Sequence, residues 1–253
     1  NLYPDFNISR LSHLELGVKD LEASFAFYVE TLGLQVTEKE SDYIYLRGME
    51  ERGHHSVILK KSEEPTCNVL GYKVFDEEQL YKAENYFNSK NINTKWIERP
   101  FQGKTLLTHD IHGIPIEFYY QMDRLPTIHQ KYKLYTGVKP LRIDHFNLFS
   151  INVDESVKFY SDLGFRVTEY TEDEKSKKLW AAWMHRKGTV HDIAFTNGVG
   201  PRLHHVAFWV PTPMNIIDLL DVMSTTGYIT NIERGPGRHG ISNAFFLLSL
   251  IHI

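Results

Sequence analysis

The sequence predicts an α+β fold in which four βαβββ modules pair into two domains, each a curved, mixed and mostly antiparallel sheet around a cavity. An internal repeat is the first observation: residues 27–38 and 159–169 both read Phe-Tyr, then Leu-Gly, then Val-Thr-Glu, with a one-residue gap. The second is that Ile-Glu-Arg at residues 97–99 returns at residues 232–234. Repeats of this kind mark equivalent supersecondary units, and one unit alone leaves a face of its sheet uncovered, so we expect the units to pair.

Helix starts and ends can be recognised in the first and third modules. Asp20 and Asp154 come before the expected helices, where a carboxylate can accept free backbone N–H groups. Gly33 and Gly164 follow these helices, and glycine readily takes the left-handed conformation that ends a helix. We therefore expect a capped helix between the opening strand and the later strands of each module.

The second and fourth modules contain helical stretches at residues 77–88 and 214–224. Thr212 is placed to cap the later helix, and Pro213 falls in its first turn, where helix starts favour proline. The pattern of strand, helix and further strands is therefore expected in all four modules.

The composition is that of an ordinary globular protein, with 42% hydrophobic and 24% charged residues in a chain of 253. The net charge of −4 gives no electrostatic footprint for nucleic acid or an anionic membrane. No apolar run approaches the roughly 20 residues that a membrane helix needs. The single cysteine, Cys67, excludes an intrachain disulfide and fits a reducing compartment. We therefore expect a cytoplasmic protein without nucleic-acid or membrane partners.

Three of the 13 histidines recur at one position in the strands that open modules, namely His13, His145 and His205. Apolar residues alternate with them, so one face of each strand is expected to pack against helices while the histidines point into the cavity. His204 falls on the opposite face from His205, so only His205 of this pair is a ligand candidate.

Two imidazoles on the cavity face of paired modules, His145 and His205, predict a metal site, since histidine is the commonest metal ligand. For either residue alone, a hydrogen-bonded structural histidine remains the alternative. Two histidines and a carboxylate form the facial triad of non-haem Fe(II) oxygenases, so a third ligand is expected. No acidic residue lies between Gly240 and Ile253, so we expect that glutamate beyond residue 253.

A polar linker at residues 121–139 separates the two pairs of modules. We expect an N-terminal pair at residues 1–135 and a C-terminal catalytic pair, incomplete at its last strand, at residues 136–253. The N-terminal pair has Glu117 at the carboxylate position, but Gly71 stands at its second histidine position. That pair is therefore expected to be non-catalytic.

Three stretches of the C-terminal half resemble the homoprotocatechuate (3,4-dihydroxyphenylacetate) 2,3-dioxygenases, type I extradiol dioxygenases of the vicinal oxygen chelate superfamily. These are Ala-Ala-Trp-Met-His-Arg-Lys-Gly-Thr-Val-His-Asp at residues 181–192, Pro-Arg-Leu-His-His-Val-Ala-Phe at 201–208, and Ile-Glu-Arg-Gly-Pro-Gly-Arg-His-Gly at 232–240. The resemblance covers nearly the whole chain and is most specific at residues 141–246. It implies a glyoxalase/extradiol dioxygenase-like fold of βαβββ modules.

The resemblance also implies roles for individual residues. His145 and His205 match the two metal-binding histidines, and His191 matches an acid–base histidine that does not bind the metal. The family binds Fe(II), or Mn(II) in some members. Positions that line the pocket for substrate and oxygen match Asn147, Trp183, Arg234 and His239.

Alternatives stay open for three of these pocket residues. Trp183 could belong to the core, and Asn147 could hydrogen-bond a neighbouring strand. Arg234 could form a surface ion pair instead of binding a substrate carboxylate.

The implied activity is extradiol (meta) ring cleavage of 3,4-dihydroxyphenylacetate by O₂ to a 2-hydroxymuconate semialdehyde, in aromatic-compound catabolism. The partners would be the small-molecule catechol and O₂, and a homo-oligomer is expected. Two alternatives remain open. One is cleavage of a different catechol, and the other is a non-catalytic small-molecule-binding protein of the same fold.

The end of the chain departs from the family pattern. Leu248 stands where the family has a tyrosine, and residues 248–253 match no family residue, so a non-native tail is expected there. His252 lies in this segment and is not expected to be a ligand. The resemblance thus implies a C-terminally truncated member of the family.

Overall fold

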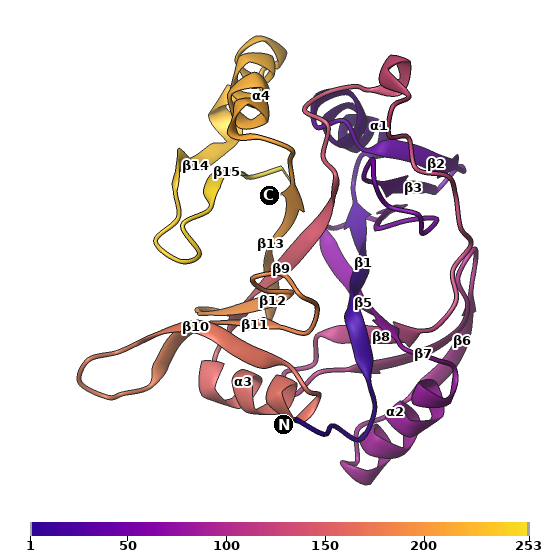
Figure 1. Cartoon of the computed structure of the whole chain (residues 1–253), viewed down its shortest axis with the longest axis vertical. Coiled ribbons are helices and arrows are strands. Elements are labelled where there is room, and N and C mark those ends of the chain that lie inside the picture. Colours follow the sequence, from indigo (N-terminus) through magenta and orange to yellow (C-terminus); the bar gives the residue numbers. More distant parts are fainter. Residues whose placement is uncertain (1, 252–253) are drawn as a thin grey trace. The chain divides into compact units, whose positions relative to one another are not determined.

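The computed structural model describes residues 2–251 and confirms the predicted α+β class, with curved mixed sheets and few helices (Figure 1). A strand, a helix and further strands follow one another four times, as the internal repeat predicted. The first module contains β1 (Ile8–Val18), α1 (Leu21–Phe25), the π-helix η1 (Ala26–Thr31), β2 (Gln35–Lys39), β3 (Tyr43–Arg47) and β4 (Val57–Lys61). The second contains β5 (Thr66–Val74), α2 (Glu78–Ser89), β6 (Lys95–Arg99), β7 (Gly103–His109) and β8 (Pro115–Tyr119).

The linker contains the 3₁₀ helix η2 (Tyr132–Leu134) and leads to the third module. This module contains β9 (Arg142–Ser150), α3 (Val153–Asp162), β10 (Arg166–Glu172), β11 (Leu179–His185) and β12 (Ile193–Asn197). The fourth contains β13 (Arg202–Trp209), α4 (Pro213–Thr226), the 3₁₀ helix η3 (Tyr228–Asn231), β14 (Ile232–Arg238) and β15 (Phe245–Ser249). Within the described part of the chain, no helix has the length and apolar character needed to cross a membrane.

The ends of the first and third helical segments follow the predicted chemistry at three positions. Asp20 caps α1, since its carboxylate accepts the backbone N–H groups of Glu22 and Ala23 at 2.9 Å each. Gly33 and Gly164 follow their helical segments with φ of 95° and 88°, in the left-handed region that favours glycine.

One predicted cap is wrong, because Asn152 and not Asp154 caps α3. The Asn152 side chain accepts the backbone N–H of Glu155 at 3.3 Å, whereas the carboxylate of Asp154 accepts the N–H of Leu179 at 3.2 Å. Asparagine and aspartate cap helices about equally well, so the sequence offered two candidates two residues apart. Thr212 caps α4 as predicted.

The described chain forms two compact units. The first comprises the residues up to Leu14 together with Cys67–Asp123 and Asp144–Ala207. The second comprises Glu15–Thr66, Arg124–Ile143 and the chain from Phe208 onward. Strand β1 therefore divides between the units after Leu14, and β9 after Ile143. The domain boundary expected between residues 135 and 136 stays a prediction.

The first unit contains strands in the orders β1-β5-β8-β7-β6 and β10-β11-β12-β9-β13. Strand β8 pairs with β5 in parallel and β12 with β9 in parallel, whereas β10–β11 and β11–β12 pair antiparallel. Helix α3 packs against β10, β11 and β12, and α2 packs against β7 (Figure 1). Strand β9 thus lies between β12 and β13 in its sheet.

Aromatic side chains fill the core of the first unit around Tyr72 of β5. Its ring centroid lies 6.0 Å from that of Phe118, 6.4 Å from Phe146 and 5.8 Å from Phe165. All four side chains are fully buried. Aromatic residues of this size contribute much of the hydrophobic stabilisation of a core, so this cluster fixes the sheet that carries β9.

The second unit contains β2-β3-β4 beside the later part of β1, together with the β14–β15 hairpin. Helix α4 packs against β15 and against η1, with the rings of Phe27 and Tyr228 at 5.4 Å. Glu51 accepts the backbone N–H of Ile143 at 3.2 Å and so holds the first residues of β9. The carboxylate of Glu50 also pairs with the guanidinium of Arg142.

Candidate metal centre

The first unit brings together the two histidines that the repeat singled out. The Nε2 atoms of His145 on β9 and His205 on β13 lie 3.2 Å apart, and the ring centroids are 5.3 Å apart. Histidine nitrogens bind a divalent metal at about 2.1 Å, so two such ligands at right angles are about 3 Å apart. The spacing of the two Nε2 atoms therefore fits adjacent ligands on one ion.

The other ring nitrogen of each imidazole already has a partner. His145 Nδ1 lies 2.8 Å from the Asp144 carboxylate, and His205 Nδ1 lies 2.7 Å from His204 Nδ1. Metal-binding histidines in proteins nearly always use their second nitrogen for such a hydrogen bond, which fixes the tautomer and the ring orientation. The arrangement leaves both Nε2 atoms directed toward one another.

The ionised form of Asp144 is favoured. Burial raises the pKa of its carboxyl group, but the hydrogen bond from His145 and the charges of His145, Lys187 and His191 outweigh burial, so the pKa lies below the usual range. An ionised carboxylate can only accept, so Nδ1 of His145 donates in this hydrogen bond and Nε2 is the ring nitrogen left for a metal ion.

Asp144 and His204 were missed as contributors to the site. Ligand atoms of Asp144, His145 and His191 all lie within 4.8 Å of one another, the one group of this kind among the described residues. The available signal was an acidic residue directly before the ligand histidine in Asp144-His145. Strand alternation hid it, because neighbouring side chains were expected on opposite faces.

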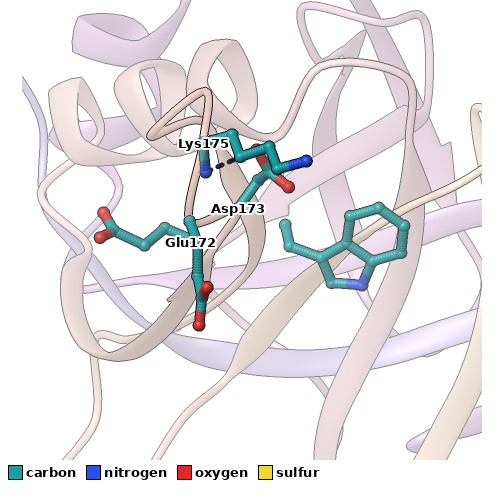
Figure 2. A pocket seen from close by; sticks show the side chains of 5 residues that line it. Glu172, Asp173 and Lys175 are labelled. Atoms are coloured by element: carbon teal, nitrogen blue, oxygen red, sulfur yellow. Dashed lines mark hydrogen bonds between the residues drawn. The ribbon is translucent and has the colours of Figure 1, made fainter.

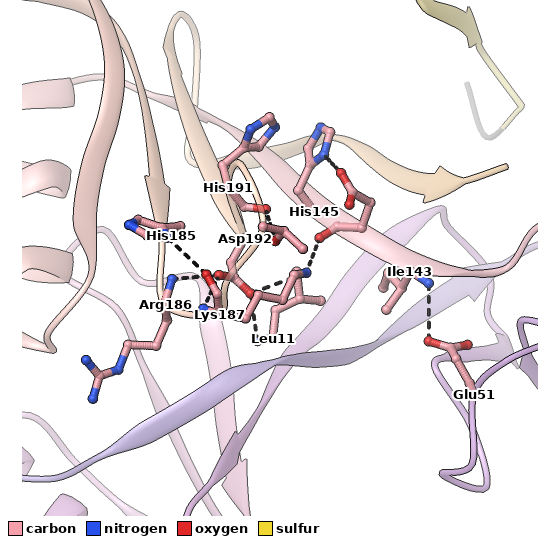
Figure 3. Close-up of polar contacts among 11 residues, drawn as sticks. Leu11, Glu51, Ile143, His145, His185, Arg186, Lys187, His191 and Asp192 are labelled. Carbon is pink, nitrogen blue, oxygen red and sulfur yellow. Dashed lines mark hydrogen bonds and ion pairs between the residues drawn. The ribbon is translucent and has the colours of Figure 1, made fainter. Parts of the chain in front are cut away.

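His191 lies beside this pair. It lies in the loop between β11 and β12 and is 6% exposed, and its ring centroid is 4.1 Å from that of His145 (Figure 3). The two rings are tilted by 55° to one another, and this contact places the imidazole of His191 next to the proposed metal ligand.

Asn147 and Trp183 share a row across this sheet. Trp183 pairs with Ala194, and Ala194 pairs with Asn147, so the three side chains lie on one face. Asn147 also follows His145 by two residues and is therefore on the face that carries that histidine. Both Asn147 and Trp183 are buried, and the hydroxyl of Thr196 donates to Asn147 Oδ1 at 3.2 Å.

Arg234 and His239 lie in the second unit, on or directly after β14. The Arg234 side chain is 73% exposed, and its Nε is 3.7 Å from the Glu233 carboxylate, the ion pair that was the alternative for this residue. His239 Nδ1 accepts the backbone N–H of Ile241 at 3.0 Å. A role for either residue in a substrate pocket stays a prediction, and His252 lies outside the described residues.

Comparison with known proteins decides the family. A sequence model of the Glyoxalase/Bleomycin resistance protein/Dioxygenase superfamily matches residues 10–105 and 142–249, which is most of the chain. The chain belongs to this superfamily. Its βαβββ modules are those expected from the sequence, and the glyoxalase/extradiol dioxygenase fold class is confirmed.

Solved structures and curated relatives place this superfamily member among the extradiol dioxygenases. A substrate complex of homoprotocatechuate 2,3-dioxygenase from Brevibacterium fuscum is 41% identical, with a TM-score of 0.94, over 99% of this chain and 79% of that one. A metapyrocatechase of Geobacillus stearothermophilus is 30% identical over 96% of this chain and 77% of its own length. A manganese-dependent 2,3-dihydroxybiphenyl 1,2-dioxygenase of Geobacillus genomosp. 3 is 29% identical over 95% and 80%. The resemblance stated from the sequence is thereby confirmed.

The N-terminal module pair of this superfamily member has a closed counterpart of the histidine site. His13 Nε2 lies 2.8 Å from Glu117, and Arg99 donates to the same carboxylate through Nε at 2.9 Å and Nη2 at 2.8 Å. A Cβ on Gly71 would lie 2.1 Å from His13 Cε1, so a second histidine has no room. The Arg99 guanidinium thus compensates the charge of the buried Glu117 carboxylate, and the non-catalytic role expected for this pair stays a prediction.

A hollow of about 450 Å³ lies on the hairpin of β10 and β11 (Figure 2). It is lined by Glu172, Asp173, Glu174, Lys175 and Trp180. None of the predicted site residues lines it. Its excess of carboxylates would repel a substrate that carries a carboxylate, so it does not compete with the histidine site for such a ligand.

Proposed function

We propose that this chain cleaves the ring of 3,4-dihydroxyphenylacetate with O₂ in the extradiol (meta) position, giving a 2-hydroxymuconate semialdehyde. The observation that carries the proposal is the convergence of His145 Nε2 and His205 Nε2, 3.2 Å apart, beside His191 in a chain of this superfamily. The substrate is supported by the Brevibacterium fuscum enzyme, which was solved with 3,4-dihydroxyphenylacetate.

Fe(II) is the proposed metal, held by His145 and His205 together with a carboxylate. The two imidazoles fit, because two histidines and one carboxylate are the ligands of non-haem Fe(II) oxygenases. The carboxylate would be the glutamate expected beyond residue 253. Mn(II) is the alternative, supported by the manganese-dependent relative. When bound, the metal would take both catechol oxygens and O₂ and lower the proton affinity of the catechol.

His191 is proposed to act as the acid–base group. Its ring lies 4.1 Å from that of His145, within reach of a substrate bound next to that histidine. It would accept the proton of a catechol hydroxyl and later hydrogen-bond the reduced oxygen. An imidazole has an ordinary pKa of about 6.5, which suits both tasks near neutral pH.

The remaining site residues would bind and orient the substrate. Trp183 and Asn147 lie on the face that carries His145, where they would flank the catechol ring and hydrogen-bond it. Arg234, aided by His239, would bind the side-chain carboxylate, since a guanidinium can donate two parallel hydrogen bonds to a carboxylate.

Metal analysis and product formation test the proposal together. The protein, purified with the segment that supplies the glutamate ligand, is loaded anaerobically with Fe(II) or Mn(II). It is then mixed with O₂ and 3,4-dihydroxyphenylacetate while oxygen uptake and the yellow semialdehyde are recorded. We expect one metal ion per chain and ring opening that depends on it. Ring opening without bound metal, or stoichiometric catechol binding without turnover, would contradict the proposal; the second result would instead indicate a binding protein of this fold.

A second candidate is extradiol cleavage of a catechol that lacks a carboxylate. The observation in its favour is that the exposed side chain of Arg234 pairs with Glu233. The names of the two Geobacillus relatives also point to different catechols, catechol itself and 2,3-dihydroxybiphenyl. Comparable kcat/KM for catechol, 2,3-dihydroxybiphenyl and 3,4-dihydroxyphenylacetate would favour this candidate, and an Arg234→Ala variant would then leave those values unchanged.

A further inference from the structure

We propose that Asp192 is a positioning residue, which folds the loop between β11 and β12 around its carboxylate and thereby holds His191 beside His145. The inference rests on the proposed role of His191 in ring cleavage. It concerns a buried acidic residue that has no assigned part in metal or substrate binding.

The Asp192 carboxylate is fully buried and accepts three backbone N–H groups (Figure 3). Oδ2 accepts from Arg186 at 2.6 Å and from Lys187 at 3.0 Å, both at the start of the loop. Oδ1 accepts from Leu11 of β1 at 3.2 Å. A single side chain at the end of the loop therefore fixes the beginning of the loop and joins it to a strand of another module.

The backbone of Asp192 is fixed as well. Its N–H donates to the carbonyl of Met184 on β11 at 2.8 Å, and its carbonyl accepts the N–H of Phe146 on β9 at 3.0 Å. Asp192 directly follows His191, and Phe146 directly follows His145. These hydrogen bonds therefore set the relative position of the two histidines along neighbouring strands.

Lys187 connects the same carboxylate to the proposed metal site. Its ammonium group lies 3.4 Å from Asp192 Oδ1 and donates to the carbonyl of Asp144 at 2.6 Å. Asp144 is the residue whose carboxylate orients His145. A buried carboxylate is stable only when it is paired and hydrogen-bonded, so Lys187 both compensates the charge of Asp192 and anchors the loop next to His145.

Residues 188–190, between these anchors, make few contacts with the rest of the chain. Val190 is 47% exposed, and a Cβ placed on Gly188 would meet no atom within 4 Å. The guanidinium of Arg186 binds Asn7, Ile8 and Gly164, but it fixes only the beginning of the loop. The contacts of Asp192, the residue that follows His191, hold this end of the loop together with the hydroxyl of Thr189, which donates to the carbonyl of His191 at 3.5 Å.

The substitution Asp192→Asn tests this dependence. Asparagine keeps the size of the side chain but has only one acceptor oxygen. The ammonium group of Lys187 favours that oxygen at the Oδ1 position, so the NH₂ group faces the backbone N–H groups of Arg186 and Lys187, which lose their acceptor. A misplacement of a catalytic group by about 1 Å can slow a reaction on the order of 10²-fold, so we expect ring opening to slow between about tenfold and a hundredfold. Metal content and the KM for the catechol should stay at the parent values.

A double-mutant cycle separates positioning from a general loss of structure. If Asp192 acts through His191, Asp192→Asn should have no further effect on ring opening in a His191→Asn background. An equal slowing in both backgrounds would overturn the proposal, as would an Asp192→Asn variant with the parent rate or with lost metal. Should Asp192→Asn fail to fold, Lys187→Met removes the ion pair with Asp192 and the anchor at Asp144 but keeps the backbone hydrogen bonds of the Asp192 carboxylate, and it should show the same dependence on His191 with a smaller slowing.

Asp173 provides a matched control. It also accepts two backbone N–H groups of its own loop, those of Lys175 at 3.2 Å and Ser176 at 2.7 Å, but on the β10–β11 hairpin. Asp173→Asn should leave ring opening unchanged.

A readout without turnover keeps this inference separate from the proposed function. In Asp192→Asn, the amide groups of Arg186 and Lys187 should exchange hydrogen faster, and the imidazole NMR signals of His191 should shift or broaden. Neither should change in Asp173→Asn. If the parent protein cleaves no catechol, the proposed function fails. An unchanged His191 signal in Asp192→Asn would overturn the positioning role itself.

Discussion

At the proposed metal site, each histidine uses its two ring nitrogens for different purposes. His145 and His205 direct Nε2 toward one another and give Nδ1 to Asp144 and His204, respectively. We therefore expect the two adjacent histidines, His204 and His205, to have different roles at the site. His205 would bind the metal, and His204 would orient His205 while its own ring packs on that of Phe149 at 4.6 Å.

Substitution of these neighbours should separate the two roles. His205→Ala removes a ligand and should abolish metal retention after gel filtration. His204→Ala removes only an orienting partner, which typically weakens metal affinity by about 10- to 100-fold, so the variant should still fill at saturating metal. Metal analysis of both variants beside the parent measures this. The opposite order of metal contents would show that His204 and not His205 faces the ion.

His191 should affect the chemistry and not the metal. Loss of an acid–base group typically slows a reaction by about 10²- to 10⁴-fold, so His191→Asn and His191→Phe should slow ring opening on the order of 10²-fold or more. Asparagine can still donate a hydrogen bond, so the Phe variant should be the slower one. Stopped-flow absorbance of the semialdehyde with parallel metal analysis measures both properties. Loss of metal from either variant would make His191 a ligand or a structural support, and the parent rate in both would make it a bystander.

At the scale of strands, the sequence predicted which residues share a face but not how their rings turn. Alternation placed His145 and Asn147 on one face because side chains along a strand have a period of two. The hydrogen bonds of Asp144 and Asp192 could not be predicted in the same way. They depend on ring rotation at His145 and on a loop that returns to β1, and neither leaves a periodic signal.

The close approach of β1 and β5 yields a stability prediction. Gly71→Ala places a Cβ 2.1 Å from His13 Cε1 and 2.4 Å from its Nε2, inside a fully buried site. The ring cannot move without breaking its hydrogen bond to Glu117, so the substitution should destabilise the protein by about 1–3 kcal/mol, the usual cost of overpacking. Urea unfolding followed by far-UV circular dichroism measures the loss.

Gly237→Ala is the control for this substitution. Gly237 also lies in a strand, β14, but a Cβ there would meet no atom within 4 Å. Its unfolding midpoint should equal or slightly exceed that of the parent, because alanine reduces the conformational entropy of the unfolded chain. Equal midpoints for Gly71→Ala and Gly237→Ala would show that the His13 ring has room to yield.

For the whole molecule, the internal repeat made the module order predictable, because equivalent units carry the same caps, glycines and strand patterns. It also predicted that only one module pair would offer two histidines. The repeat could not predict how the N-terminal pair compensates the negative charge of its buried carboxylate, Glu117. Arg99 and Gln102 reach Glu117 from β6 and from the turn after it, and contacts between strands far apart in sequence have no signature within either strand.

That buried carboxylate leads to a prediction for the acid stability of the whole chain. Burial raises the pKa of Glu117, but the hydrogen bond and charge of His13, the charge of Arg99 and the hydrogen bond from Gln102 lower it to about 2. An unfolded glutamate has a pKa of about 4.3. The native pKa is the lower one, so the stabilisation is fully present above about pH 4.3 and is lost as the pH falls toward about 2.

Glu117→Gln should remove this pH dependence. A difference of about two pKa units corresponds to about 3 kcal/mol, so the free energy of unfolding of the parent should fall relative to that of the variant by about this amount between pH 5 and pH 2. Urea titrations at several pH values measure the difference, and other acidic groups cancel because both proteins contain them. Glu64→Gln is the control, since Glu64 is 74% exposed and pairs with Lys19 at the surface, where ion pairs contribute little. A constant difference between parent and Glu117→Gln over this range would mean that Glu117 has the same pKa in the folded and unfolded chains.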